Sequence, residues 1–415
     1  MIAACGGGSG GGGNSATTVA LAGAGGTDSA AAAEAPASAP APADVTAEPG
    51  VLSVAQAEAV REAQAATETL TVTALQSNVG ADGTPFASST PLPATPQAAA
   101  SSDGGPAVSG VLRWSDRKTW GGELPGAGAQ VVVPAGKTIL LDIATPSLGA
   151  LSIEGTLRFD DRNVALTASS INVTGTLEIG TVTAPFVNKA TITLTGPQMP
   201  TNDGVSRGII VSGGRLELHG TSPSPVWTKL NEHAEAGAKT LSLADPTSYW
   251  RAGDIIAVAP TDYYGVAQTE RLTLTDASGK TLTTSQGLAA FRWGKLQYMT
   301  SQGMSLTPEA GYTPPVTPAP TVLDERAEVG NLSRNIVIQG ADDDAWRMYG
   351  FGAHLMIMDL KSKVTVDGVE FRRVGQAGQM ARYPIHWHLL SYAPDGSFIG
   401  DTVGHSIQNS AIWNS

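Results

Sequence analysis

The sequence predicts an all-β protein whose main body is a β-solenoid. Glycine and proline are abundant, with 49 and 26 residues, whereas aromatic residues make up 6% of the chain. This balance is typical of short strands joined by many turns. The segments IEGTL at 153–157 and VTGTL at 173–177 are near copies offset by twenty residues, and VSG at 211–213 with Leu216 repeats the pattern loosely. A repeat of this length in strand-forming sequence is typical of coils that stack on one another.

Residues 1–5 resemble the end of a bacterial signal peptide. Small residues precede Cys5, as in a lipobox, where the cysteine becomes lipidated after signal cleavage. The basic and apolar stretch that normally comes first is missing, and an unmodified thiol is the alternative. Cys5 is the one cysteine of the chain, so no disulfide can form within it. We therefore expect a lipid-anchored or secreted protein of the bacterial cell envelope.

The composition of residues 6–109 predicts a tether. They consist mainly of Gly, Ala, Ser, Pro and Thr, with few large apolar residues. Such a segment cannot bury enough apolar surface to offset the entropy lost on ordering. We expect it to hold the folded part away from a membrane surface.

Three β-rich parts follow, which we place at residues 110–230, 231–330 and 331–415. The first holds the twenty-residue repeats, and the second holds ordinary strands with turn signals and a proline-rich loop. The third resumes the solenoid rhythm in NIVIQG, VTVDGVEF and SIQNSAIW and stops in mid-pattern. A β-helix that ends on an apolar strand exposes an unpaired edge. We therefore expect the sequence to be a fragment, truncated before a cap.

Composition excludes some partners. The formal net charge is −12 and the pI is about 4.9, which argues against nucleic acid because phosphate binding needs clustered Lys and Arg. The same charge counts mildly against a highly anionic substrate. No window reaches the roughly eighteen apolar residues of a membrane helix.

The stretch RYPIHWHLL is the most informative part of the chain. Side chains alternate along a strand, so Ile385, Trp387 and Leu389 are expected to face a core while His386 and His388 face outward together. At about 3.3 Å per residue the two histidines would be roughly 6 to 7 Å apart at the backbone. Their rings could then converge on one ligand or ion.

Further polar residues stand near one-coil offsets from this pair. Glu370 lies eighteen residues before His388, and Gln408 lies twenty after it. We expect the three to stack on one outer face at about 4.8 Å spacing. The remaining candidates would lie beside this ladder or in the connection that reaches over it: Arg372, Arg373, Gln376, Arg382 and Tyr383.

These residue types suit chemistry on an acidic sugar. Glycoside cleavage needs two carboxyl groups or, for elimination, a base beside a group that neutralises a uronate carboxylate. We assign the catalytic roles to His386, His388, Glu370 and Arg382, and substrate binding to Arg372, Arg373, Gln376, Tyr383 and Gln408. A second catalytic carboxylate is not evident, because Asp367 and Asp401 are better suited to shaping turns.

Two other interpretations of the face stay open. His386, His388 and Glu370 would give three ligands for a divalent metal and leave a position for water. The ladder could instead be purely structural. Elsewhere, His354 could join the same face, but a satisfied histidine near a turn is the favoured interpretation. The acidic run at 342–344 is better explained as a solvated loop than as a calcium site.

Several motifs resemble known domains. WSD at 114–116, TWGG at 119–122, LPG at 124–126 and GTLEIG at 175–180 resemble the G8 domain. Downstream, AEVGNLSRNIVIQG and RYPIHWHL resemble the cell-migration-inducing hyaluronidase group, which includes transmembrane protein 2 and, more distantly, fibrocystin. The resemblance covers roughly residues 109–415 and implies a G8 domain followed by a right-handed parallel β-helix. It implies hyaluronan binding or depolymerisation, but fold alone does not settle activity.

The sequence thus predicts a surface protein that binds a polysaccharide, with two hypotheses for its activity. In one, the His386 and His388 face cleaves a uronic-acid-containing glycan by hydrolysis or elimination. In the other, the solenoid is a non-catalytic adhesin or matrix-binding module. The sequence leaves the oligomeric state and the identity of the polysaccharide open.

Overall fold

The computed structural model describes residues 110–198, 206–262, 268–314, 321–392, 395 and 397–415. Cys5 and the predicted tether lie outside these residues. Almost all of the described chain is strand, turn or loop, apart from one 3₁₀ turn, η1 (Arg117–Trp120), and one short helix, α2 (Asp344–Tyr349). No helix in the described ranges is long and apolar enough to cross a membrane. The all-β prediction is confirmed.

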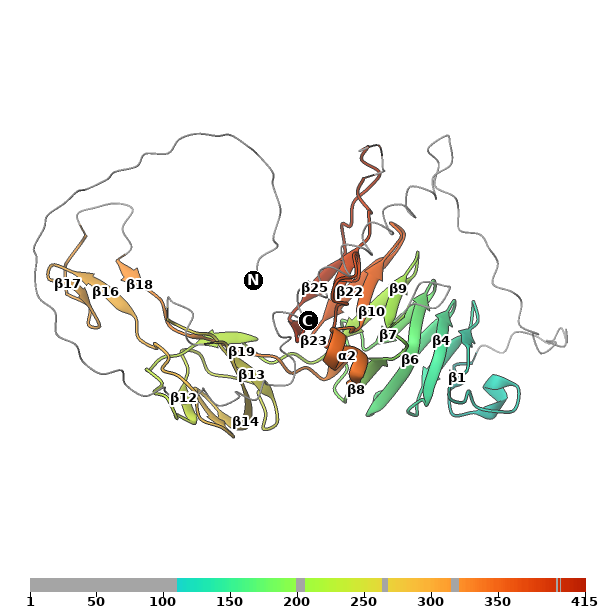
Figure 1. The fold of residues 1–415 in the computed structure, drawn as a ribbon, viewed down its shortest axis with the longest axis horizontal. Helices are drawn as coiled ribbons and strands as arrows, with labels where there is room; N and C mark the ends of the chain where they lie inside the picture. Colours follow the sequence, from blue (N-terminus) through green and yellow to red (C-terminus); the bar gives the residue numbers. More distant parts are fainter. Residues whose placement is uncertain (1–109, 199–205, 263–267, 315–320, 393–394, 396) are drawn as a thin grey trace, which may run out of the picture. The chain divides into compact units, whose positions relative to one another are not determined.

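Two long parallel sheets build the solenoid. The first contains seven strands within the described residues, each paired in parallel with the next. Several of them are labelled in Figure 1 among the arrows of the solenoid. In sheet order they are β1 (Leu112–Arg113), β3 (Thr138–Leu141), β5 (Thr156–Phe159), β7 (Thr176–Ile179), β10 (Arg215–His219), β22 (Lys363–Asp367) and β25 (Ser406–Gln408).

The second sheet contains ten strands in the same part of the chain. It divides at the long strand β6, whose first half pairs with β8 and whose second half pairs with β9. From there on, each coil has three separate strands. The members are β2 (Val131–Val133), β4 (Ser147–Ile153), β6 (Val164–Val173), β8 (Ala190–Leu194), β9 (Gly208–Val211), β20 (Ile336–Gly340), β21 (His354–Ile357), β23 (Val369–Arg372), β24 (Ile385–Trp387) and β26 (Ala411–Trp413).

An antiparallel domain is inserted between β10 and β20. Its larger sheet has a separate apolar core that includes Leu241, Ile256 and Leu282. The strands of that sheet are β11 (Trp227–Lys229), β12 (Thr240–Ser242), β13 (Ile255–Val258), β14 (Glu270–Ser278), β15 (Thr281–Thr284) and β19 (Glu328–Asn331). A smaller sheet contains β16 (Gln297–Thr300), β17 (Gly303–Ser305) and β18 (Val322–Leu323).

The solenoid continues across this insertion. Strands β20, β21 and β22 pair in parallel with β8, β9 and β10, although more than a hundred residues separate the two coils along the chain. The stretch with the twenty-residue repeats and the C-terminal stretch therefore share one core. The prediction of a parallel β-helix is confirmed, and its coils begin within the repeat region.

The repeats are in register, as predicted. Leu157 pairs with Leu177, Leu177 with Leu216, and Leu216 with Val364, and all four side chains are fully buried. Each position thus stacks one aliphatic side chain on another. At roughly 1.5–3 kcal/mol for each fully buried aliphatic side chain, these columns are a main source of stability.

Glycine is required at the corner between two faces. A Cβ on Gly155 would clash with the carbonyl oxygens of Pro134 and Lys137, and one on Gly175 would clash with the carbonyl oxygen of Gly155. The same oxygen of Gly155 accepts a 2.7 Å hydrogen bond from the backbone N–H of Thr176. The coils approach so closely here that a side chain has no space.

We predict that Gly175→Ala destabilises the solenoid by about 1–3 kcal/mol, because the backbone must shift to admit the methyl group. Gly126→Ala is the matched control, since a Cβ there would meet no atom within 4 Å. Urea unfolding followed by circular dichroism measures the difference. Equal midpoints for the two variants would contradict the corner constraint.

Candidate functional site

Strand β24 carries the histidine pair on the outside of the solenoid. It pairs in parallel with β21, and His386 stands opposite Met356. Ile385 and Trp387 pack against the solenoid core, so His386 between them faces away from it. The predicted alternation is confirmed for these residues.

The alternation ends one residue earlier than predicted. Leu389 is 71% exposed, and the following residue, Leu390, is buried in the core instead. The reason is the backbone of Leu389, whose φ of 51° is left-handed and breaks the extended conformation. The backbone N–H of His388 still donates to the carbonyl oxygen of Ile357, at 2.9 Å.

The two imidazoles touch. Nε2 of His386 and Nδ1 of His388 are 3.2 Å apart, and the ring centroids are 5.3 Å apart. The ring of Tyr383 lies 5.0 Å from that of His386, and Tyr383 is half exposed. A hydrogen bond between two imidazoles needs one nitrogen as acceptor, so at least one ring is neutral.

A buried histidine lies on the strand next to the pair. His354, on β21, is 2% exposed, and its Nε2 lies 3.3 Å from Nη1 of Arg382. A guanidinium can only donate, so this nitrogen of His354 accepts. Burial, with Arg382 and His386 nearby, lowers the pKa of His354 to about 3. Burial also lowers the pKa of His386, with further contributions from His388 and Arg382, so both rings are poised to stay neutral.

Gln376 lies beside the buried ring. Its Nε2 donates to the carbonyl oxygens of Ser206 and Gly352 at 2.9 and 3.2 Å, and Nδ1 of His354 is 3.3 Å away. Gln376 is itself buried. The backbone therefore holds its amide group, which is not turned to solvent for a substrate. We call Tyr383, Arg382, His386, His388, His354 and Gln376 the histidine cluster.

Glu370 is not part of this cluster, contrary to the predicted ladder. It lies on β23, between Val337 on β20 and Ala411 on β26. Glu370, His388 and Gln408 occupy three successive segments of one coil. The twenty-residue spacing does not persist, because Val369 follows its stacked partner Ile336 by thirty-three residues.

Buried charges surround Glu370. It is 3% exposed, and one carboxylate oxygen accepts a 3.1 Å hydrogen bond from the backbone N–H of Arg334. Burial raises the pKa of Glu370 and lowers that of Arg334 to about 10. The Arg334 side chain donates to the carbonyl oxygens of Asn331, Ser333 and Asn409. This arrangement ties the end of the inserted domain to two coils of the solenoid, which is a structural role.

The two predicted binding arginines lie near Glu370 and not near the histidines, and Nη1 of Arg372 is 3.5 Å from Oε1 of Glu370. Arg372 and Arg373 both donate to Oε1 of Gln339, each at 2.7 Å. Gln408 is exposed on β25, opposite Asp367. Of the predicted site residues, the structure brings together His386, His388, Arg382, Tyr383 and Gln376, and it separates Glu370, Arg372, Arg373 and Gln408 from them.

The predicted three-ligand metal set is not assembled, because Glu370 lies on another strand. Among the described residues, no group of three or more His, Cys, Asp or Glu side chains is placed to hold a metal ion. In the acidic run, Asp343 caps α2 and pairs with the buried guanidinium of Arg207 at 2.6 Å, while Asp342 pairs with Arg347 at 3.0 Å. Asp401 accepts from the backbone N–H of Val403, as expected of a turn residue.

Sequence reasoning missed the role of Arg334 and favoured a satisfied histidine over a site residue for His354. Arg334 acts on a residue thirty-six positions away, and no local pattern reports such a contact. A signal for His354 did exist in the sequence. Its strand, β21, is the parallel neighbour of β24, so the segment around His354 could have been aligned with RYPIHWH as the preceding coil. The unequal coil lengths hid that alignment.

Comparison with known families defines the class. Residues 119–231 match the G8 domain, and residues 350–415 match the CEMIP beta-helix. Together with the fold, these matches define an all-β chain in which a G8 domain is continuous with a parallel β-helix. The histidine cluster takes four of its members from the segment Arg382–His388, within the β-helix match.

Particular relatives align with most of the chain. Fibrocystin-L of Homo sapiens is 33% identical over 346 residues, which is 73% of this chain and 8% of the relative. Fibrocystin-L of Mus musculus is 34% identical over 343 residues, and a G8 domain-containing protein of Dictyostelium discoideum is 28% identical over 313 residues, or 19% of that protein. The chain therefore spans less than a tenth of fibrocystin-L.

We predict that His354 makes the stability of the fold depend on pH. The unfolded ring takes up a proton near its ordinary pKa of 6.5, whereas the folded ring does so only near 3. The unfolded state thus binds more protons between these values, and the free energy of unfolding falls as pH drops from about 6.5 toward 3.

Urea unfolding across this range, for the natural chain and for His354→Gln, isolates that contribution from other acid-sensitive groups. The variant should show a shallower slope. Selective ¹³C labelling of histidine gives a second check, because the His354 resonance should not titrate above pH 4.5. Titration of that resonance near pH 6.5 would contradict the buried, neutral assignment.

Proposed function

We propose that this chain binds a uronic-acid-containing polysaccharide on the outside of the solenoid, at the histidine cluster. The observation that carries the proposal is the exposed Tyr383 beside two imidazoles in contact, with the Arg382 guanidinium on the neighbouring His354. An aromatic ring suits the apolar face of a sugar, and imidazoles and a guanidinium suit its hydroxyl and carboxylate groups. The matches to the G8 domain and the CEMIP beta-helix support an extracellular, hyaluronidase-like domain.

The cluster favours local recognition over long-range attraction. The chain carries a net charge of −12, so its overall field repels an anionic polymer. Binding must therefore depend on close contacts that survive screening by salt. A solenoid surface is suited to this, because neighbouring coils present side chains along an extended ligand.

If the cluster cleaves its ligand, elimination fits these side chains better than hydrolysis. Hydrolysis generally uses two carboxyl groups that flank the scissile bond, and Glu370 is buried on another strand. Elimination needs a neutral base near the proton beside the uronate carboxylate, a group that stabilises the carboxylate, and an acid for the leaving oxygen. His386 with its lowered pKa, Arg382 and Tyr383 could fill these three roles.

The non-catalytic adhesin remains the second candidate, and one observation favours it. The acid predicted from sequence, Glu370, is held by Arg334 at the base of the inserted domain. A surface that has lost this partner can still bind a polymer through stacking and hydrogen bonds.

We expect His386→Ala/His388→Ala to weaken binding of hyaluronan oligosaccharides by about tenfold or more, the equivalent of about 1.4 kcal/mol. Calorimetry with the full chain measures it. Lys363→Ala, which removes an exposed positive charge on β22, is the matched control and should bind as the natural chain does. Unchanged binding in the double variant would refute the site.

The same proteins, incubated with a panel of uronate polysaccharides, separate the two candidates. Elimination leaves an unsaturated uronate that absorbs ultraviolet light, hydrolysis leaves only a new reducing end, and an adhesin leaves the polymer intact. A chelator arm tests whether the two ring nitrogens of the pair hold a divalent ion.

We also propose that Cys5 carries a lipid anchor in a bacterial envelope. The support is the run of small residues before it and the tether-like composition after it. In detergent phase separation from a bacterial host, the natural protein should partition with detergent and Cys5→Ser with water. Ser9→Ala is the control for a neighbouring change, and identical partitioning of the cysteine variant would contradict the anchor.

A further inference from the structure

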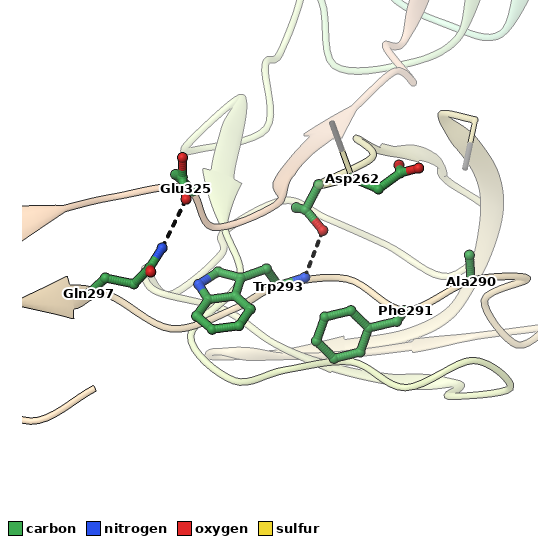
Figure 2. A pocket seen from close by; sticks show the side chains of 7 residues that line it. Asp262, Ala290, Phe291, Trp293, Gln297 and Glu325 are labelled. Carbon is green, nitrogen blue, oxygen red and sulfur yellow. Dashed lines mark hydrogen bonds between the residues drawn. The ribbon is translucent and has the colours of Figure 1, made fainter. Parts of the chain in front are cut away.

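The inserted domain contains a cleft of its own. Its volume is about 450 Å³, within the roughly 300–1,000 Å³ typical of small-molecule sites. Figure 2 shows its lining side chains. They come from the segment after β13, from the segment that leads into β16 and its first residue, and from the connection between β18 and β19: Thr261 and Asp262, then Phe291, Trp293 and Gln297, then Glu325.

Two aromatic rings form one side of the cleft, and both are held in place. His233 packs against Trp293 with ring centroids 4.5 Å apart, and against Phe291 with centroids 5.4 Å apart. The indole N–H of Trp293 donates to the carbonyl oxygen of Lys295 at 2.5 Å, and its backbone N–H donates to Oγ1 of Thr261 at 2.9 Å. The rings therefore lose little freedom when a ligand binds.

A buried ion pair fixes the backbone between the rings. Arg292 is fully buried and donates to Oε1 of Glu270 at 2.7 Å and to the carbonyl oxygen of Gln268 at 2.8 Å. Because side chains alternate, burying Arg292 turns Phe291 and Trp293 to the opposite side. Phe291 is 41% exposed as a result.

Polar groups form the other side. Nε2 of Gln297 donates to Oε2 of Glu325 at 2.9 Å. In Figure 2 the carboxyl groups of Glu325 and Asp262 lie across the pocket from the two rings. The cleft thus pairs a rigid apolar wall with hydrogen-bonding groups that carry negative charge.

We propose that this cleft binds a neutral sugar residue. A pyranose ring has one face of C–H groups, which suits an aromatic wall, and an edge of hydroxyls, which suits amide and carboxylate oxygens. Two carboxylates disfavour a uronate, because like charges repel in a partly desolvated site. The cleft and the histidine cluster therefore select different chemistry, and this second site does not depend on the first.

The experiment uses the full chain and ligand-observed saturation-transfer NMR with cellobiose, maltose and N,N′-diacetylchitobiose. A hyaluronan tetrasaccharide and choline are added as an anionic and a cationic probe. We expect at least one neutral disaccharide to bind, with saturation strongest on the C–H face of one ring. Trp293→Ala and, independently, Phe291→Ala and Gln297→Ala should each raise its Kd at least fivefold.

Trp227→Ala is the matched control, because Trp227 is 48% exposed on β11 of the same domain and does not line the cleft. It should bind with unchanged Kd, and so should His386→Ala/His388→Ala, which separates this proposal from the one above. Phe291→Ala and Gln297→Ala keep the test valid if Trp293→Ala unfolds, as melting would show. Preference for choline, no binding of any neutral disaccharide, or unchanged affinity in the folded variants would overturn the proposal.

Discussion

The in-register stacking of coils is the constraint on which the rest of the structure depends. Parallel strands alternate their side chains in step, so an aliphatic column in the core requires a matching set of outward residues in every coil. The column through Leu157, Leu177, Leu216 and Val364 continues across the inserted domain. The solenoid continues after more than a hundred inserted residues because the returning strands β20, β21 and β22 pair in register with β8, β9 and β10.

The histidine cluster follows from this constraint. Ile385 and Trp387 must enter the core, and His386 is turned outward in consequence. The neighbouring strand β21 supplies the buried His354 next to the histidine pair, and the ring of His354 contacts Arg382. A second polar arrangement lies on the preceding strand, β23. There Glu370 accepts a hydrogen bond from the backbone of Arg334, which connects the inserted domain to the solenoid. The two sets have different roles, because one reaches the surface and the other is covered.

The inserted domain has a different physical basis. Its antiparallel sheet buries one face in a separate core, so its loops are free of the stacking rule. Those loops build the cleft around Phe291 and Trp293, where a buried arginine sets the direction of the aromatic side chains. A regular solenoid surface suits a repeating polymer, whereas an irregular cleft suits a single sugar residue.

The sequence by itself determined the all-β class, the register of the twenty-residue repeats and the outward direction of His386, because periodicity and turn residues are local properties. It placed Glu370 and Gln408 beside His388 by assuming that one coil length holds throughout. Only the tertiary structure decided that later coils are longer, that Leu389 ends the alternation, and that Arg334 covers Glu370. Loop length between strands does not alter the pattern within a strand, so a local pattern cannot report which strands stack.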